Sequence, residues 1–129
     1  MPILNVKISA DRSSENTNAI NDLLLDLTSR ILKKKREVTS IAIEYVNPGD
    51  WSIGGVALKE QGKTTFYFDI KITDETNTKD EKAKYIQESF EGFKKIFGNL
   101  HETSYIHIED VRAAAYGFGG LTQEYRNHH

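Results

Sequence analysis

The chain has 129 residues, 38% hydrophobic and 28% charged, a size and composition that fit a single globular domain and exclude a disordered tail or a membrane protein. Its 17 basic and 19 acidic side chains give a net charge of -2, which is too balanced for a chain that binds nucleic acid through its phosphates. There is no cysteine, signal-peptide pattern or apolar run of spanning length, so we expect a cytoplasmic protein without disulfides, thiolate metal sites or membrane contact.

The first half of the chain begins with a strand and continues with a helix. Polar and apolar residues alternate over residues 3–9, which predicts a strand. Ser13 is the expected cap of the following helix, and Glu15 lies in its first turn, where the helix dipole favours an anion. The apolar residues of this helix recur with helical spacing: Ile20, Leu23, Leu24, Leu27 and Ile31. A second strand is predicted over residues 41–46, followed by a turn and a Gly-Gly pair.

The second half shows the same order of elements. Alternation over residues 66–72 predicts a strand, and Thr78 and Glu81 have the spacing of a helix capping box. The expected apolar stripe of this helix consists of Ile86, Phe90, Phe93 and Phe97. Gly98 is expected to end the helix, and residues 105–111 form the last predicted strand.

An offset of 65 residues superposes the two halves. It places residues 41–46 on 106–111 with four of six positions identical, and it places Trp51 on Tyr116, each three residues before a Gly-Gly pair. Chance similarity between amphipathic strands explains the alternation but not the two matching Gly-Gly segments. We therefore interpret residues 1–129 as one domain made of two β-α-β repeats, residues 2–62 and 63–125.

Two strands that flank one helix form a parallel crossover, so the predicted fold is α+β, with one four-stranded mixed sheet and both helices on one face. The other face of the sheet would then be bare and half polar. By alternation it carries Asn5, Lys7, Tyr67, Asp69, Lys71, Tyr105, His107 and Glu109. An oligomer would cover this face and form clefts at its subunit boundaries, where a small ligand could bind.

Pro2 is the residue best suited to chemistry. A small second residue permits removal of Met1, and the new terminus would be a secondary amine. An α-amino group has a pKa of about 7.7 to 8.0, and burial or a nearby cation lowers that pKa toward the range of a general base at neutral pH. Such a base needs no cofactor and no metal, so we expect neither.

The placement of Pro2 before the first strand, of Arg12 before the helix and of Trp51 ahead of a Gly-Gly pair resembles the tautomerase superfamily. The first half resembles one subunit of 4-oxalocrotonate tautomerase (4-OT), and the whole chain resembles the double-length members, which include macrophage migration inhibitory factor. The resemblance implies a β-α-β homotrimer in which the amino-terminal proline acts as base or acid in a pocket formed by the oligomer. Phe66, the counterpart of Pro2, lies inside the chain, so one reactive amine is expected in each subunit.

The resemblance also implies several substrate-binding residues. Arg12 matches the family arginine that contacts a substrate carboxylate, and a solvated residue at the helix start is an equal alternative for it. Arg36 occupies the place of a lysine near the pocket, although the dipole of the preceding helix equally explains a basic residue there. Ile72 and Tyr105 match pocket positions of the migration-inhibitory-factor branch, with an ordinary place in the hydrophobic core as the alternative. Lys71 is a further candidate cation for the carboxylate.

Three more candidates complete the expected site. Phe118 or Trp51 would form the apolar wall that removes water from the amine. His107 departs from the family pattern and would hydrogen-bond either a substrate oxygen or a neighbouring carboxylate on the sheet.

These residues support three functional hypotheses. The first is a cofactor-independent tautomerase that converts the enol of a small 2-oxo acid to its keto form, with Pro2 as general base and acid. The second keeps the amine but hydrates, dehalogenates or decarboxylates a small unsaturated or oxo acid, with Glu109 or Asp69 beside it; the residues expected for dehalogenation are replaced in this chain. The third is a trimeric binding or signalling module without catalysis.

Overall fold

The computed structural model describes residues 1–129 as an α+β fold built on one four-stranded sheet. The elements, with η for a 3-10 helix, are β1 (Ile3–Ile8), α1 (Ser14–Arg30), η1 (Arg36–Val38), β2 (Ser40–Tyr45), η2 (Pro48–Asp50), β3 (Ser52–Ile53), β4 (Val56–Ala57), α2 (Leu58–Gln61), β5 (Phe66–Thr73), α3 (Lys79–Phe97), β6 (Tyr105–Val111), η3 (Ala113–Ala115), β7 (Gly117–Phe118), β8 (Leu121–Thr122) and α4 (Gln123–His128). The four strands of the sheet and the two long helices agree with the sequence-based prediction, whereas the short strands β3, β4, β7 and β8 and the helices α2 and α4 were not predicted. No helix is both long and apolar enough to span a membrane.

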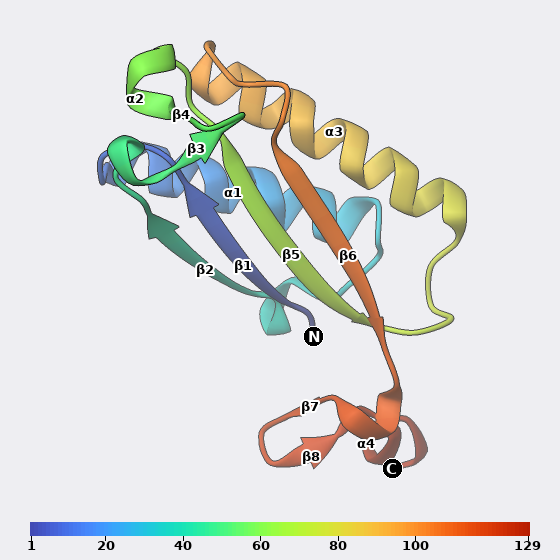
Figure 1. Ribbon diagram of the computed structural model, residues 1–129. Helices are drawn as coiled ribbons and strands as arrows, with labels where there is room; N and C mark the ends of the chain where they lie inside the picture. The colour runs from blue at the N-terminus through green and yellow to red at the C-terminus, as the bar shows by residue number, and fades with distance from the viewer.

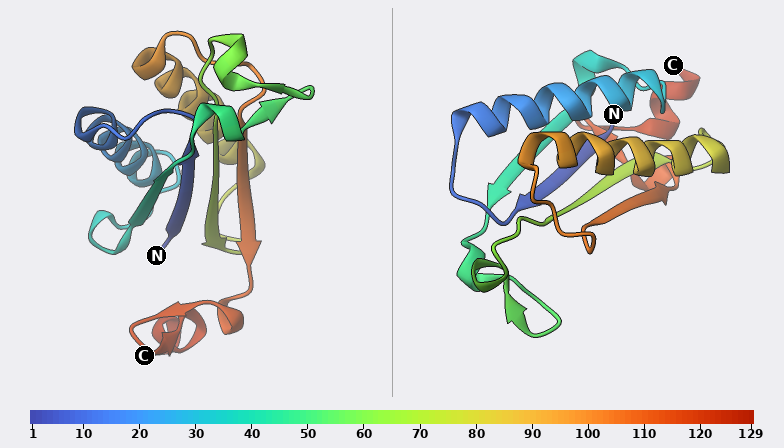
Figure 2. Two further views of the ribbon diagram at one scale, coloured as in Figure 1. Left: turned by 60° about the vertical axis from the view of Figure 1, so that its left-hand side comes forward. Right: turned by 90° about the horizontal axis from the view of Figure 1, so that it is seen from above.

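The strands of the sheet lie in the order β2-β1-β5-β6. β1 is parallel to β2 and β5 is parallel to β6, while the central pair, β1 and β5, is antiparallel. Both long helices cover the same face of the sheet (Figures 1 and 2). This arrangement confirms the predicted mixed sheet with two helices on one face.

The hydrophobic core fills the space between the sheet and the helices. Leu4, Val6 and Ile8 of β1 point into it, as do alternate residues of β5. Aromatic rings dominate its second half, where the rings of Phe66 and Phe93 stack with their centroids 3.9 Å apart. The residues between these positions face away from the helices and form the bare face that the alternation predicted.

The helix caps were predicted correctly, but the apolar stripe of α3 was partly wrong. The Ser13 hydroxyl accepts a hydrogen bond from the Asn16 backbone N–H at 3.2 Å, and Thr78 and Glu81 form a capping box. Ile86, expected in the core, is 40% exposed, and Tyr85 is buried in its place. The apolar spacing gave the wrong residue because the buried face of α3 includes a polar residue, Ser89, between Tyr85 and Phe93.

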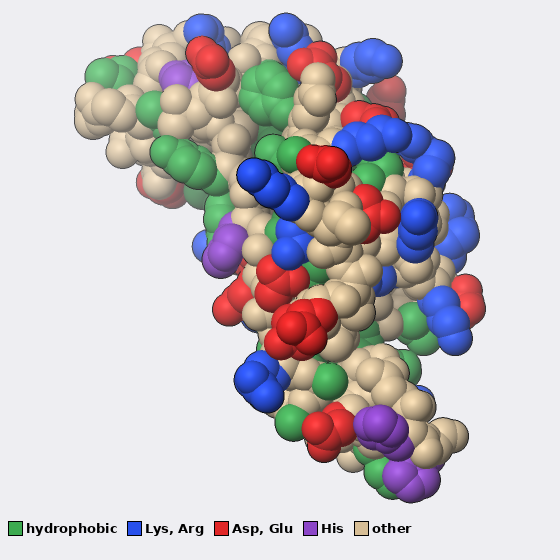
Figure 3. All heavy atoms as spheres, turned by 90° about the vertical axis from the view of Figure 1, so that its right-hand side faces the viewer, with side chains coloured by type: hydrophobic (Ala, Val, Ile, Leu, Met, Phe, Trp, Pro, Cys, Tyr) green, Lys and Arg blue, Asp and Glu red, His purple; other side chains and the backbone are tan.

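Two hairpins lie 65 residues apart in the chain. β3 and β4 are joined by Gly54 and Gly55, and β7 and β8 by Gly119 and Gly120; all four glycines have positive φ angles between 62° and 82°. The first hairpin lies at the opposite end of the sheet from the N-terminus (Figure 1). The second hairpin and α4 form a smaller lobe beyond the end of β6, which we call the C-terminal lobe, residues 112–129 (Figures 1 and 3).

Candidate active site

Pro2 lies immediately before β1, at the end of the sheet that faces the C-terminal lobe (Figure 1). The residue is buried, and its carbonyl accepts a hydrogen bond from the Ser40 backbone N–H at 3.0 Å. It lines a cavity of about 500 Å³, which we call the proline cavity. The other main lining residues of this cavity are Met1, Ile3, Glu37, Val38, Tyr116 and Phe118.

Tyr116 attaches the C-terminal lobe to the sheet beside this cavity. Its hydroxyl accepts a hydrogen bond from the Ile3 backbone N–H at 3.1 Å and donates one to the Lys71 carbonyl at 2.9 Å. Burial raises the pKa of the Tyr116 phenol, so this hydroxyl stays protonated at neutral pH. The position of Phe118, two residues further along, is therefore fixed relative to Pro2.

A second cavity, of about 620 Å³, lies next to the first. We call it the cationic cavity because its walls include Lys33, Lys34, Lys35 and Arg126, with Glu37 as the single acidic residue. Met1, Glu37, Val38 and Phe118 line both cavities. Met1, next to Pro2 in the chain, is thus one of the four residues that the two cavities share.

The electrostatic environment favours a neutral amine at this point. Burial lowers the pKa of the Met1 α-amino group below its ordinary value, and the positive charges of Lys34, Lys35 and Arg126 lower it further. Glu37 acts in the opposite direction. After removal of Met1 the α-amine would belong to Pro2, one residue further into the protein and close to the same charged side chains.

Two of the predicted site residues meet at the proline cavity, namely Pro2 and Phe118. Lys71 reaches this region only through its backbone carbonyl, since its ammonium group binds Asp69 at 3.1 Å. Arg36 begins η1 next to the cavity residues Glu37 and Val38, but it lines neither of the two cavities.

The structure does not bring the remaining candidates to Pro2 within one protomer. Arg12 follows β1 and Trp51 precedes β3, so both lie at the opposite end of the sheet (Figure 1). Ile72 is 1% exposed, belongs to the hydrophobic core and lines neither of the two cavities. Tyr105 and His107 lie on the bare face of β6, beside Tyr67 and Asp69 of β5.

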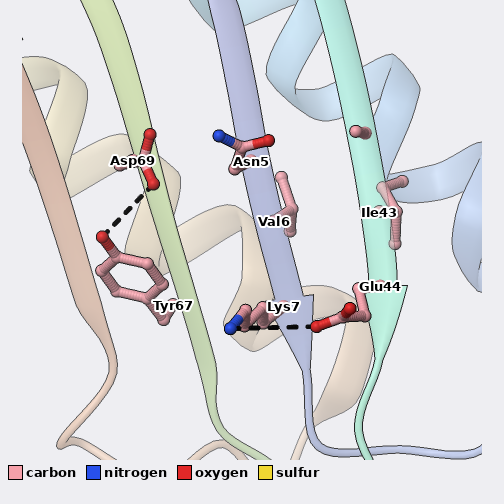
Figure 4. Close-up of a pocket in the computed structure, with 8 residues that line it drawn as sticks. Asn5, Val6, Lys7, Ile43, Glu44, Tyr67 and Asp69 are labelled. Carbon is pink, nitrogen blue, oxygen red and sulfur yellow. Dashed lines mark hydrogen bonds and ion pairs between the residues drawn. The ribbon is translucent and has the colours of Figure 1, made fainter.

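The bare sheet face has a groove of its own, of about 370 Å³, across β5, β1 and β2 (Figure 4). Its charged groups are paired within the sheet: Lys7 lies 3.8 Å from Glu44, and the Tyr67 hydroxyl donates a hydrogen bond to Asp69 at 3.3 Å. Burial and the adjacent Asp69 raise the pKa of Tyr67. These groups are occupied with one another, so the groove is a weaker site candidate than the proline cavity.

Sequence reasoning missed Tyr116 as an anchor and Glu37, Val38, Lys34 and Arg126 as cavity residues. The offset of 65 residues marked Tyr116 as an aromatic counterpart of Trp51, but not the hydrogen bonds of its hydroxyl. No signal in the sequence indicated that residue 126 returns to the N-terminus.

No family model and no curated protein sequence matches the chain. Native fused 4-OT superposes with a TM-score of 0.85 at 14% identity, over 97% of this chain and 98% of that chain. The chain has the tautomerase fold. A wild-type F6 fused 4-OT, described as an asymmetric trimer, has the same tautomerase fold with a TM-score of 0.83 at 15% identity, over 96% and 98% of the two chains.

The tautomerase fold also includes proteins with other activities. FG41 malonate semialdehyde decarboxylase, in a structure inhibited by 3-bromopropiolate, superposes with a TM-score of 0.75 at 17% identity, over 98% of this chain and 95% of that one. At such identities the fold is shared and the reaction must be argued from the site.

Proposed function

We propose that the protein is a cofactor-independent tautomerase that converts the enol of a small 2-oxo acid into its keto form. Pro2 is the general base and acid, after removal of Met1. The observation that carries this proposal is the position of the buried Pro2 in a cavity beside Met1, whose α-amine has a pKa lowered by burial and then by the charges of Lys34, Lys35 and Arg126. The tautomerase fold of the chain supports it.

The reaction needs one proton to move within the substrate. The neutral Pro2 amine takes the proton of the enol hydroxyl as the carbonyl forms, and the resulting ammonium group returns a proton to the adjacent carbon. The lowered pKa matters because the amine must be unprotonated when the substrate binds. General acid-base transfer of this kind contributes roughly 10²- to 10⁴-fold to the rate.

The walls of the proline cavity support the amine in this task. Val38 and Phe118 supply apolar surface beside Pro2, which excludes water and strengthens electrostatic interactions within the cavity. Tyr116 fixes the residue that follows Pro2, so the nitrogen is held in one position relative to a bound substrate.

We further propose that the protein is a homotrimer. The bare sheet face includes Tyr105, which is 66% exposed, and such a face is unusual for a monomer. The fused 4-OT trimer with the same fold supports this assembly. In a trimer, residues remote from Pro2 in one protomer, such as Arg12 and His107, would approach the cavity of a neighbour.

Intact mass and a Pro2→Ala variant test the proposed reaction. Mass spectrometry is expected to show loss of Met1, and the purified protein is expected to ketonise phenylenolpyruvate. Pro2→Ala keeps a terminal amine but loses the secondary amine, and we expect kcat to fall by about 10²-fold. Full activity of Pro2→Ala, or of protein that retains Met1, would overturn the mechanism.

A second candidate function is hydration of a small unsaturated acid. Glu37 favours it, because this carboxylate lines both cavities next to the position of the amine and could activate a water molecule. Proton NMR of 2-oxo-3-pentynoate and 3-bromopropiolate incubated with the protein distinguishes the candidates: a hydrated product supports hydration. An unmodified amine, unchanged probes and no ketonisation together would instead indicate a binding module.

A further inference from the structure

The cationic cavity contains positive charges that the chain itself does not neutralise. Of its four cations, only Lys33 forms an ion pair, with Glu81 at 3.5 Å. Lys34 donates a hydrogen bond to the Thr76 hydroxyl at 2.9 Å, and burial lowers the pKa of Lys34. A half-buried ammonium group without a carboxylate partner is stabilised when an anion enters.

Arg126 is held in a defined position at this cavity. Its guanidinium carbon lies 3.9 Å from the centroid of the Phe118 ring, and its Nη2 donates a hydrogen bond to the Phe118 carbonyl at 2.9 Å. The guanidinium group also lies close to Gly119, where an added Cβ would lie 2.8 Å from Nη2 and displace it. The guanidinium group is therefore fixed before any ligand binds.

The polar atoms of this arginine are not all satisfied. Arg126 Nε is buried and has no hydrogen-bond partner, and the same is true of Gln123 Oε1, one turn earlier on α4. Buried polar atoms without partners are rare in folded proteins, and a bound anion is one partner that would satisfy the Nε donor. An oxygen of a carboxylate is a suitable partner for a guanidinium N–H.

The two cavities differ in character. Pro2 and Tyr116 line only the proline cavity, Lys34 and Arg126 line only the cationic cavity, and the apolar residues Val38 and Phe118 line both. A ligand that spans both would place a carboxylate at one end and an apolar group at the other. Its central carbons would then lie beside the amine.

We propose that Arg126, assisted by Lys34, binds the carboxylate of the substrate, and that the substrate is a 2-oxo monocarboxylic acid with an apolar substituent at carbon 3. The substrate class rests on the proposed function, whereas anion binding at Arg126 does not. This assignment gives the C-terminal lobe a direct role in substrate binding. It also places the amine and the carboxylate-binding group in the same protomer.

Binding of two unreactive probes tests the role of Arg126 without turnover. The probes are 3-phenylpropionate and its neutral isostere 3-phenylpropionamide, titrated by calorimetry into the intact protein. The wild type is expected to bind the carboxylate at least about 10-fold more tightly than the amide. Arg126→Gln is expected to abolish this preference, and Arg126→Lys to restore part of it.

Arg30→Gln is the matched control, because Arg30 is exposed and bonded to Asp26 and Glu88 on the helical side of the molecule. It is expected to keep the full preference. Equal binding of both probes by the wild type would overturn the inference, as would a preference unchanged in Arg126→Gln and lost in Arg12→Gln. Circular dichroism checks that each variant is folded. If Arg126→Gln is not folded, the comparison is made with Arg126→Lys.

Kinetics separate this inference from the proposed function. With phenylenolpyruvate, Arg126→Gln is expected to raise KM by about 10-fold or more. With the dicarboxylate 2-hydroxymuconate, the wild type is expected to show a lower kcat/KM than with phenylenolpyruvate, and the reverse order would overturn the substrate class. A protein that prefers the carboxylate probe but ketonises neither enol would refute the proposed function and leave anion binding at Arg126 intact.

Discussion

The Tyr116 hydroxyl accepts a hydrogen bond from the backbone N–H of Ile3 at 3.1 Å, across 113 residues of sequence. Because it also donates to the Lys71 carbonyl, one phenol joins the C-terminal lobe to both central strands of the sheet. The first backbone N–H after Pro2 thus depends on a residue from the far end of the chain. A change in the C-terminal lobe is therefore expected to alter the position of the amine.

Tyr116→Phe is expected to lower both stability and activity. The Ile3 N–H and the Lys71 carbonyl each lose a partner, which costs about 1 to 3 kcal/mol in the free energy of unfolding. The loss of positioning is expected to reduce kcat as well. Urea unfolding and ketonisation rates measure the two effects. Tyr125→Phe is the control, because that hydroxyl makes no hydrogen bond and the side chain is 46% exposed; an equal effect in both variants would contradict the prediction.

The pH dependence of activity follows from the lowered pKa of the α-amine. The base is active when unprotonated, so kcat/KM is expected to rise with pH through a pKa below the ordinary value of an α-amino group. Lys35→Gln removes a positive charge that disfavours the protonated amine. This variant is therefore expected to shift the rising limb to higher pH. A shift toward lower pH in the rate profile, or in an ¹⁵N NMR titration of the terminal nitrogen, would refute the electrostatic argument.

The hydrogen bond between Tyr85 and Thr28 offers a test of the core. The two hydroxyls lie 2.8 Å apart, both buried between α1 and α3. Tyr85→Phe leaves the Thr28 hydroxyl buried without its partner, and we expect a loss of about 1 to 3 kcal/mol in the free energy of unfolding. Adding Thr28→Val removes the orphaned hydroxyl and is expected to recover part of the loss. Chemical denaturation checks both steps, and no recovery in the double variant would mean that packing dominates.

The bare sheet face provides a test of assembly. Sedimentation equilibrium is expected to give the mass of a trimer for the wild type. Tyr105→Arg places a charge on a side chain that is 66% exposed in one protomer and that the proposed interface would cover. We expect this variant to dissociate to monomers, with activity falling if neighbours complete the site. A wild type that sediments as a monomer would remove the homotrimer from the proposal.

Local signals explain why most of the fold could be predicted. Alternation in β1 and β5 is visible because one face of each strand is buried and the other is not. Ser13 and Thr78 mark the helix starts through hydrogen bonds made within three residues. The inner face of α3 was misassigned at Ile86, because Ser89 and Tyr85 are buried through tertiary contacts that their polarity does not predict.

Of the candidate site, only the residue whose chemistry follows from its position in the chain could be predicted. Pro2 could be singled out because its chemistry follows from its place next to Met1. Arg126 could not, because α4 has only six residues and the lobe that carries it is attached to the sheet by the long-range hydrogen bonds of Tyr116. Arg12 matched a family motif, but a strand of six residues separates it from Pro2.

Met1 lines both cavities, and Asn127, near the other end of the chain, lines one of them. A peptide fused ahead of Met1 would emerge beside both cavities, and a bulky fusion after His129 would follow closely on Asn127. Affinity tags for purification should therefore be cleavable at both ends, because an inactive tagged preparation would not test the proposed activity.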